Sequence, residues 1–284
     1  AMESDLGGAS KFTNIKKSNP ENFIQCGISE ANMIGVGCGL SSEGFIPYVH
    51  TFGPFATRRV YDQIYLSGAY AHNTINIYGS DPGFTVGPNG GTHTTWEDVA
   101  LMREIPGSII VDPCDETQTR WVVKELSKHE GVHYIRANRK DVRNVYTPDS
   151  TFELGKGNVL REGKDILIIV SGQLVSDALD CAEKLVEEGY SVEVIDMYCV
   201  KPLDIDLVLS ESKGKKAVVT FENHSIYGGL GSAVAEVLME NGVNVPFKRH
   251  GVDERFGQVG TPDFLQKEFQ LTADDLYRTI KSMI

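Results

Sequence analysis

The sequence has 284 residues, of which 41% are hydrophobic and 23% are charged, and its formal net charge is -12. A chain of this length and apolar content can bury the cores of two ordinary globular domains, which excludes a disordered or fibrous protein. The negative charge argues against nucleic acid or an anionic membrane surface as a partner, because both would repel the chain. No apolar run approaches the roughly 20 residues that a bilayer-spanning helix needs, and no basic-then-apolar signal pattern opens the chain.

The five cysteines are widely spaced and form no C-x-x-C pair, and several lie in apolar runs. This pattern favours buried reduced thiols over disulfides or a zinc site. The histidines have no metal-ligand spacing with cysteines or carboxylates, so we expect no metal ligands in this chain. Together these features predict a soluble, cytoplasmic protein.

The first half of the chain alternates between helical and extended patterns. Residues 5–10 read as the turn after a strand whose beginning is missing, so we expect this domain to lack an N-terminal segment. The predicted helices cover residues 25–44, 53–70, 96–103 and 115–128, and the predicted strands cover residues 45–51, 74–78, 108–111 and 132–137. The alternation predicts an α/β fold with a parallel sheet that is covered on both faces.

A charged, glycine-containing segment then interrupts the alternation. It predicts a first domain at residues 1–147, a linker at 148–162 and a second domain at 163–284. In the second domain we expect strands at 165–171, 191–197 and 216–222, and helices at 175–188 and from 202. Residues 228–231 lead into a further helix through 240, and residues 246–250 and 264–284 close the domain. The sequence therefore predicts two successive parallel-sheet domains.

The stretch 25–55 carries a carboxylate, a helix with three glycines and a pair of aromatic residues. Ser29 suits the N-cap of the helix and Glu30 its first turn, where a carboxylate complements the helix dipole. The three helical glycines, at positions 35, 37 and 39, each cost roughly 1 kcal/mol relative to alanine. Close approach of another helix, between subunits, would compensate for that cost.

Four longer motifs in this order resemble the C-terminal half of transketolases, and in particular the split type whose two halves are separate polypeptides. They read GISEANMIGVGCGLSSEGFIPYVHTFGPF, NGGTHTTWEDVALMREIP, ELGKGNVLREGKDILIIVSG and ENHSIYGGLGSAVAE. The resemblance covers nearly the whole chain. It implies a pyrimidine-binding domain followed by a transketolase C-terminal domain.

The resemblance also implies thiamine diphosphate as the cofactor. In such enzymes a glutamate beside N1′ of the aminopyrimidine promotes the proton transfer that activates C2 of the thiazolium, and Glu30 matches that glutamate. Phe52 and Phe55 match the aromatic wall against the pyrimidine, and Arg58 and Asp5 match positions that face the cofactor. Taken alone, Glu30 fits a helix-capping carboxylate, the two phenylalanines fit plain core, and Arg58 fits a surface residue.

Further residues match the substrate side of the family's site. His93 stands where a histidine contacts the sugar and assists proton transfer, and Arg139 matches a phosphate-binding arginine. The other members of the predicted substrate-binding set are Ser10, Asp81, Asn89 and Arg136. Arg136 ends the last predicted strand of the first domain, where ligand contacts are common, although solvated surface is an equal alternative for it.

Three positions depart from the family pattern. Asp81 replaces a usual histidine, Asn89 replaces a usual aspartate that reads a hydroxyl, and Thr94 replaces a common glutamine. These changes predict a transketolase-type reaction on a sugar pair that differs from the ordinary one.

The diphosphate-binding half of the family is absent from this sequence. The resemblance therefore implies a separate N-terminal subunit that holds the diphosphate and Mg²⁺ (or Ca²⁺), an α2β2 assembly, and sugar phosphates as substrates. The transferred group would be a two-carbon ketol unit. Two alternatives stay open: a related thiamine enzyme subunit, of the 2-oxoacid dehydrogenase β or deoxyxylulose-phosphate synthase kind, and a non-catalytic regulatory paralogue.

Two features of the second domain are assigned to structure. The run GGLG at 228–231 follows a strand, yet it does not give G-x-G-x-x-G, so we do not expect dinucleotide binding. Glu222 and His224 are expected to serve packing or subunit contact.

Overall fold

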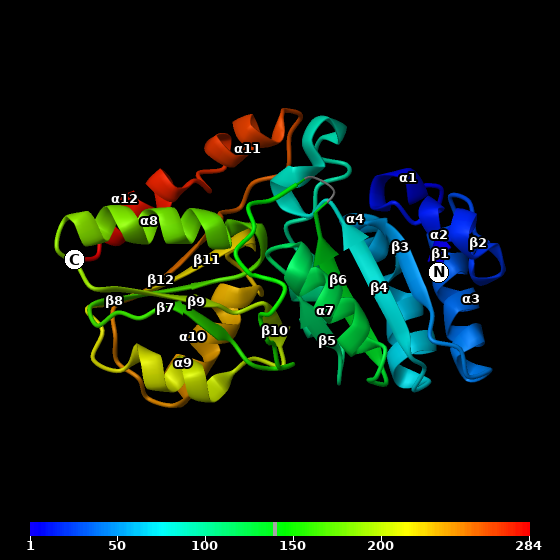
Figure 1. The fold of residues 1–284 in the computed structure, drawn as a ribbon, viewed down its shortest axis with the longest axis horizontal. Coiled ribbons are helices and arrows are strands. Elements are labelled where there is room, and N and C mark those ends of the chain that lie inside the picture. Colours follow the sequence, from blue (N-terminus) through cyan, green and yellow to red (C-terminus); the bar gives the residue numbers. More distant parts are fainter. Residues whose placement is uncertain (139–140) are drawn as a thin grey trace.

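The computed structural model describes residues 1–138 and 141–284 and contains two sheets that lie side by side (Figure 1). The first sheet has seven strands in the order β10-β5-β6-β4-β3-β1-β2, and the second has five in the order β12-β11-β8-β9-β7. Strands within each sheet are mostly parallel, with helices on both faces. The expected α/β fold with two parallel-sheet domains is therefore confirmed.

The first sheet is parallel except at one edge. Its strands are β1 (Met2–Glu3), β2 (Ile24–Gln25), β3 (Tyr48–Phe52), β4 (Ile75–Ser80), β5 (Ile109–Val111), β6 (Val132–Ala137) and β10 (Cys199–Lys201). Strand β10 runs antiparallel to β5, with Cys199 opposite Val111. Because the other strands are parallel, their carboxyl ends meet at one edge of the sheet, where the loops that follow them gather.

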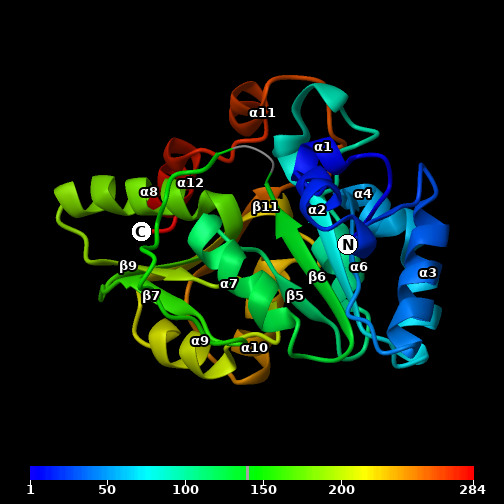
Figure 2. The same cartoon turned by 45° about the vertical axis from the view of Figure 1, so that its right-hand side comes forward.

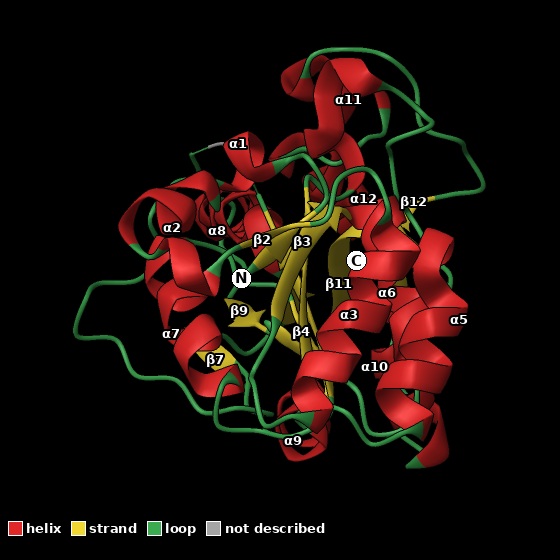
Figure 3. Ribbon diagram, turned by 90° about the vertical axis from the view of Figure 1, so that its right-hand side faces the viewer, coloured by secondary structure: helices red, strands yellow, loops and turns green. Residues whose placement is uncertain are grey.

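Helices cover both faces of this sheet (Figure 2 and Figure 3). One face carries α3 (Glu30–Ser42), α4 (Gly53–Ala56), η2 (Arg58–Val60), α5 (Tyr61–Gln63), η3 (Ile64–Tyr70) and α6 (Asp98–Arg103). The other carries α1 (Gly7–Ser10), α2 (Thr13–Ser18) and α7 (Glu116–Leu126). Two short turns, η1 (Pro20–Asn22) and η4 (Gly83–Asn89), lie in the connections.

The helix predicted at 53–70 is broken into short pieces. At Thr57 the backbone has φ -127° and ψ -88°, which is not helical, and the Thr57 hydroxyl donates a hydrogen bond to the Gly53 carbonyl at 2.8 Å. A threonine side chain that bonds back to the preceding turn competes with regular helix formation. Arg58 and Arg59 follow this break directly, at the start of η2.

The second sheet holds the apolar core of the C-terminal domain. Its strands are β7 (Asn158–Arg161), β8 (Ile166–Val170), β9 (Val192–Asp196), β11 (Ala217–Ser225) and β12 (Phe247–Val252). Its helices are η5 (Gly172–Leu174), α8 (Val175–Glu187), α9 (Ile205–Ser212), α10 (Leu230–Glu240), α11 (Pro262–Glu268) and α12 (Ala273–Lys281). Figure 1 shows α8 and α12 above this sheet and α9 and α10 below it.

Two short strands cross the boundaries that the sequence predicts. Strand β7 lies inside the predicted linker at 148–162 and pairs antiparallel with β9 of the second sheet. Strand β10 lies in the predicted second domain but completes the first sheet. The two sheets are thus joined by backbone pairing as well as by packing.

A buried ion-pair cluster also joins the two domains. The Arg136 guanidinium lies 2.7 Å from Asp98 and 3.0 Å from Asp112, and it donates a 2.9 Å hydrogen bond to the Asn223 carbonyl of the second domain. Arg136 is 1% exposed. Burial lowers the pKa of nearby His224 to about 4, so this imidazole is neutral at pH 7. The packing role expected for His224 agrees with this position.

No helix in the described parts of the chain is long and apolar enough to cross a membrane. The five cysteines are free thiols.

Candidate active site

The carboxyl edge of the first sheet gathers residues from several strands. Phe52 ends β3 and pairs in register with Ser80, which ends β4. Ser80 in turn pairs with Ala137 at the end of β6, and β1 ends beside β3 shortly before Asp5. The segments that carry the predicted cofactor and substrate residues therefore meet at this edge.

Glu30 opens helix α3, with Ser29 at the N-cap, as predicted. The Ser29 side chain makes no capping hydrogen bond; instead, the Ser29 N–H donates to the Ser4 hydroxyl at 3.3 Å. Glu30 is only 5% exposed. Its carboxylate lies 2.8 Å from Arg59 Nη1, which compensates for burial of the negative charge.

Three rings form a cluster beside this carboxylate. Phe52, Phe55 and His93 lie edge to face, with centroids 6.2 Å apart for the two phenylalanines, 5.6 Å for Phe52 and His93, and 5.1 Å for Phe55 and His93. The Arg59 guanidinium carbon lies 3.6 Å from the Phe55 centroid. The structure thus brings together Glu30, the predicted aromatic pair and the predicted histidine.

Arg59 was not predicted for this site, whereas its neighbour Arg58 was. Arg58 lies 2.6 Å from Glu97 and donates hydrogen bonds to the carbonyls of Thr92 and Thr94, at 3.3 and 3.5 Å. It therefore holds the loop that carries His93. The sequence signal for Arg59 was that two adjacent arginines follow the F-x-x-F pattern. This signal does not indicate which of the two arginines contacts Glu30.

The loop before His93 is packed under the second domain. A Cβ at Gly91 would lie 2.3 Å from the Gly257 carbonyl oxygen, so only glycine fits this approach of the two backbones. Figure 1 shows α11 of the second domain beside this loop. The position of His93 is consequently fixed from both domains.

The three departures from the family pattern lie in different surroundings. Asp81 is buried and has a left-handed backbone, with φ 56°. Thr94 is also buried, and its hydroxyl donates to the Gly90 carbonyl at 3.0 Å. Asn89 is exposed at the tip of the loop.

Ser10 lines a cavity that is described in the next paragraph, and three other predicted residues remain. Asp5 is exposed with φ 60°, in the turn after β1. The surface alternative for Arg136 is wrong, and its guanidinium is fully engaged by Asp98, Asp112 and the Asn223 carbonyl, so we remove Arg136 from the substrate-binding set. Arg139 lies outside the described residues.

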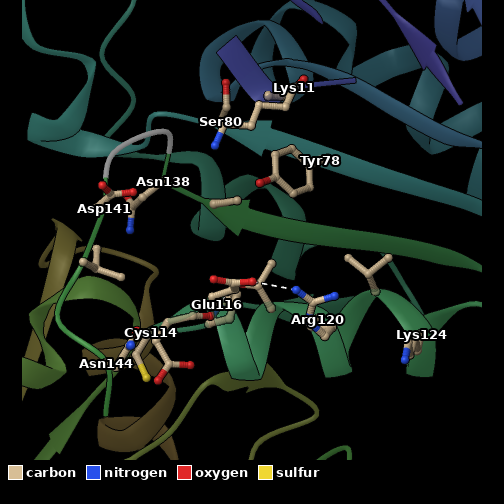
Figure 4. Close-up of a pocket in the computed structure, with 17 residues that line it drawn as sticks. Lys11, Tyr78, Ser80, Cys114, Glu116, Arg120, Lys124, Asn138, Asp141 and Asn144 are labelled. Atoms are coloured by element: carbon tan, nitrogen blue, oxygen red, sulfur yellow. Dashed lines mark hydrogen bonds and ion pairs between the residues drawn. The ribbon is translucent and has the colours of Figure 1, made fainter. Parts of the chain in front are cut away.

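A cavity of about 770 Å³ opens beside this edge, between α1 and α7 and over β4 and β6 (Figure 4). Ser10, Tyr78, Ser80 and Asn138 line it. Its charged lining comprises the bases Lys11, Arg120 and Lys124 and the acids Asp115, Glu116 and Asp141. Arg120 pairs with Glu116 at 2.6 Å. Ser80 on the cavity wall is the register partner of Phe52, whereas Phe52, Phe55 and His93 do not themselves line the cavity.

The site's own groups suit one part of a thiamine cofactor. A buried carboxylate and an aromatic face already hold one planar nitrogen group, the Arg59 guanidinium, and an aminopyrimidine has similar shape and bonding. Within the described residues, by contrast, no group of three or more histidine, cysteine or acidic side chains could hold a metal ion.

Comparisons with known proteins match both parts of the chain to domains of one family. The family "Transketolase, pyrimidine binding domain" matches residues 1–145, and "Transketolase, C-terminal domain" matches residues 155–276. The chain is 44% identical over 278 residues to the 6-deoxy-6-sulfo-D-fructose transketolase subunit SqwH of Clostridium sp. (strain MSTE9), covering 98% of this chain and 86% of that one. It is 37% identical to the putative transketolase C-terminal section of Methanocaldococcus jannaschii, covering 98% and 88%.

A solved structure described as a split gene transketolase, inactive beta4 tetramer, superposes with a TM-score of 0.91 at 39% identity, covering 99% of this chain and 90% of that one. Both its fold and its sequence therefore resemble the present chain. With both family domains matched in order, the chain belongs to the transketolase family, and the most similar relatives named above include split-gene transketolase subunits.

Proposed function

We propose that this chain is the pyrimidine-binding subunit of a thiamine-diphosphate-dependent transketolase that transfers a two-carbon ketol unit between sugars. The observation that carries the proposal is the arrangement of Glu30, a buried carboxylate, beside the Phe52, Phe55 and His93 rings. Isolated capping carboxylates are usually solvated, whereas this one is buried and shares its partner Arg59 with the Phe55 ring.

Thiamine diphosphate, when bound, supplies the nucleophilic carbon that attacks the ketose. Glu30 would hydrogen bond to N1′ of the aminopyrimidine and hold a proton there. Phe55 would pack against the ring and exclude water, which strengthens the hydrogen bond to Glu30. His93 would contact a sugar hydroxyl and transfer its proton, since a histidine can do so near neutral pH.

The remaining half of the site would come from a separate N-terminal subunit, in an α2β2 assembly. That subunit would bind the diphosphate and Mg²⁺ or Ca²⁺. An exposed face of α3 supports the proposal of a partner subunit. A Cβ atom at Gly35 or Gly39 would meet no other atom within 4 Å, and Val36 is exposed beside them. A helix with such a face can approach another backbone closely.

We propose that the substrate is a ketose with an anionic end, in the cytoplasm, and that it differs from the ordinary pentose phosphate pair. Ser10 and Lys11 on the wall of the cavity offer a hydroxyl and a cation to such an end, and Arg139 is proposed to join them. The altered residues Asp81, Asn89 and Thr94 and the similarity to a sulfofructose transketolase subunit support an unusual sugar. The 6-sulfonated ketose is therefore the first substrate to test.

The experiment is reconstitution with a separate N-terminal transketolase subunit. Neither chain should be active alone, and the mixture should transfer ketol units from 6-deoxy-6-sulfofructose faster than from xylulose 5-phosphate with ribose 5-phosphate as acceptor. Glu30→Gln should abolish this activity, and Glu43→Gln, which changes an exposed carboxylate just beyond the end of the same helix, should not.

Three outcomes would contradict the proposal. Activity of this chain alone would remove the need for a partner, and turnover of pyruvate would indicate a related thiamine enzyme. Unchanged activity in Glu30→Gln would exclude the proposed role of the carboxylate. Preference for the ordinary sugar pair would reject the substrate proposal alone.

A further inference from the structure

Arg59 makes two contacts that a bound cofactor would need for itself. Its Nη1 lies 2.8 Å from Glu30 Oε1, and its guanidinium carbon lies 3.6 Å from the centroid of Phe55. A planar, nitrogen-rich group is therefore held between a carboxylate and an aromatic face. An aminopyrimidine would require the same carboxylate and the same face.

We propose that Arg59 occupies the place of the pyrimidine ring before the cofactor binds, and that it must swing out as the cofactor enters. The proposal rests on the proposed function, because it takes Glu30 and Phe55 as the pyrimidine site. The two occupants exclude each other: one carboxylate oxygen and one ring face cannot serve both. Arg59 is thus a competitor built into the subunit.

Burial of the carboxylate explains why Glu30 needs such a partner. The Glu30 side chain is 6% exposed, and a buried carboxylate without a partner is strongly unfavourable. Arg59 supplies the opposite charge while its own side chain remains 44% exposed. It also covers the face of Phe55, which would otherwise be open to water.

The same exposure lets Arg59 leave. Nearly half of its side chain already faces solvent, and an arginine has enough rotatable bonds to move its guanidinium without moving the backbone. Arg58 differs, since Glu97 and two loop carbonyls hold it. Of the two adjacent arginines, one is therefore a fixed support of the His93 loop and the other a movable cover of the cofactor site.

The competition has a measurable consequence for cofactor affinity. Removing the guanidinium removes the occupant that the cofactor must displace, and it leaves Glu30 in need of a partner that the cofactor can supply. We expect Arg59→Met to bind thiamine diphosphate about five- to twentyfold more tightly than the wild type, as loss of a partly exposed ion pair and a cation–π contact would allow. Arg59→Lys keeps the charge but not the planar stacking, so its affinity should lie between the two.

The test measures the dissociation constant of thiamine diphosphate for the reconstituted complex by calorimetric titration at saturating Mg²⁺, and its association rate by stopped-flow fluorescence. Arg143→Met, which breaks an exposed ion pair to Asp180, is the control and should bind as the wild type does. Thermal melting of each complex without cofactor reports whether Arg59→Met folds. If it does not fold, Arg59→Lys carries the comparison.

The outcomes distinguish the inference about Arg59 from the proposed function. Equal or weaker binding by a folded Arg59 variant overturns the inference, and it leaves the proposed function intact if Glu30→Gln is inactive. Tighter binding supports the inference. A wild-type complex that binds no thiamine diphosphate refutes the proposed function, and the inference with it.

Discussion

Gly35 and Gly37 lie two residues apart in α3 and face opposite surroundings. A Cβ at Gly37 would lie 3.2 Å from Ile75 Cδ1 and 3.4 Å from Val49 Cγ1, inside the core of the first domain. A Cβ at Gly35 would meet no atom within 4 Å. The subunit's own packing therefore explains Gly37, whereas nothing in the described residues packs closely enough against position 35 to require a glycine there.

Gly35→Leu should separate folding from assembly. Leucine favours a helix over glycine by up to about 1 kcal/mol, and the site has room, so the isolated chain should melt at the same temperature or higher. The new side chain would prevent a partner backbone from approaching α3, so the α2β2 complex should weaken at least tenfold. Sedimentation of mixtures with the N-terminal subunit measures this.

Glu183→Leu places the same side chain on an exposed position of α8 and is the matched control, which should assemble normally. Normal assembly of Gly35→Leu would show that this face of α3 does not contact the partner. A lowered melting temperature of the isolated chain would show that Gly35 is needed for folding instead.

The start of α3 and most parallel strands could be predicted because their signals are local. A serine before an acidic first turn marks a helix start, and β-branched runs between turn residues mark strands. Strand β10 was missed since it has three residues and pairs antiparallel with a strand nearly 90 residues earlier. Length and local pattern carry no information about such a partner.

Part of the candidate site could also be predicted because its signals are local motifs. Glu30, Phe52, Phe55 and His93 were found through family motifs, and the structure brings them together. Arg59 was missed because its partner Glu30 lies 29 residues earlier, and no local pattern indicates that these two side chains meet. Arg136 was misjudged because its partners Asp98 and Asp112 come from separate elements, and no spacing in the sequence announces them.

The buried cluster at the domain junction should be essential for stability. Arg136→Met removes the cation and leaves Asp98 and Asp112 buried beside each other without it. Breaking a buried pair in this way costs about 3–5 kcal/mol, whereas an exposed pair contributes about 0–1 kcal/mol. Urea denaturation of the isolated chain should therefore show a large loss for Arg136→Met and little loss for Arg143→Met. Equal small losses would mean that water reaches the cluster.

Phe55 and His93 should affect different steps although their rings touch. Phe55→Ala removes the proposed wall against the pyrimidine and should weaken thiamine diphosphate binding by about tenfold or more. His93→Ala should leave that affinity within about threefold and lower kcat by about 10²–10⁴, the range for general acid–base groups. His129→Ala, on the loop after α7, is the control for loss of a histidine. The same loss of cofactor affinity in both variants would contradict the division of roles.

Glu222 should make stability depend on pH in a defined direction. It accepts hydrogen bonds from the Leu230 and Gly231 N–H groups, and burial raises its pKa to about 7 from an ordinary value near 4.5. The pKa of Glu222 is higher in the folded than in the unfolded state. Its contribution to the free energy of unfolding is therefore complete below about pH 4.5 and is lost as the pH rises through 7. The neighbouring His224 has a lowered pKa and acts in the opposite direction, so the wild type must be compared with Glu222→Gln at each pH.

Between pH 6 and 8 the stability of the wild type relative to Glu222→Gln should fall by roughly 1 kcal/mol, as urea denaturation would measure. Glu187→Gln, at the exposed end of α8, should show no such change, and a constant difference for Glu222→Gln would mean that Glu222 stays ionised throughout.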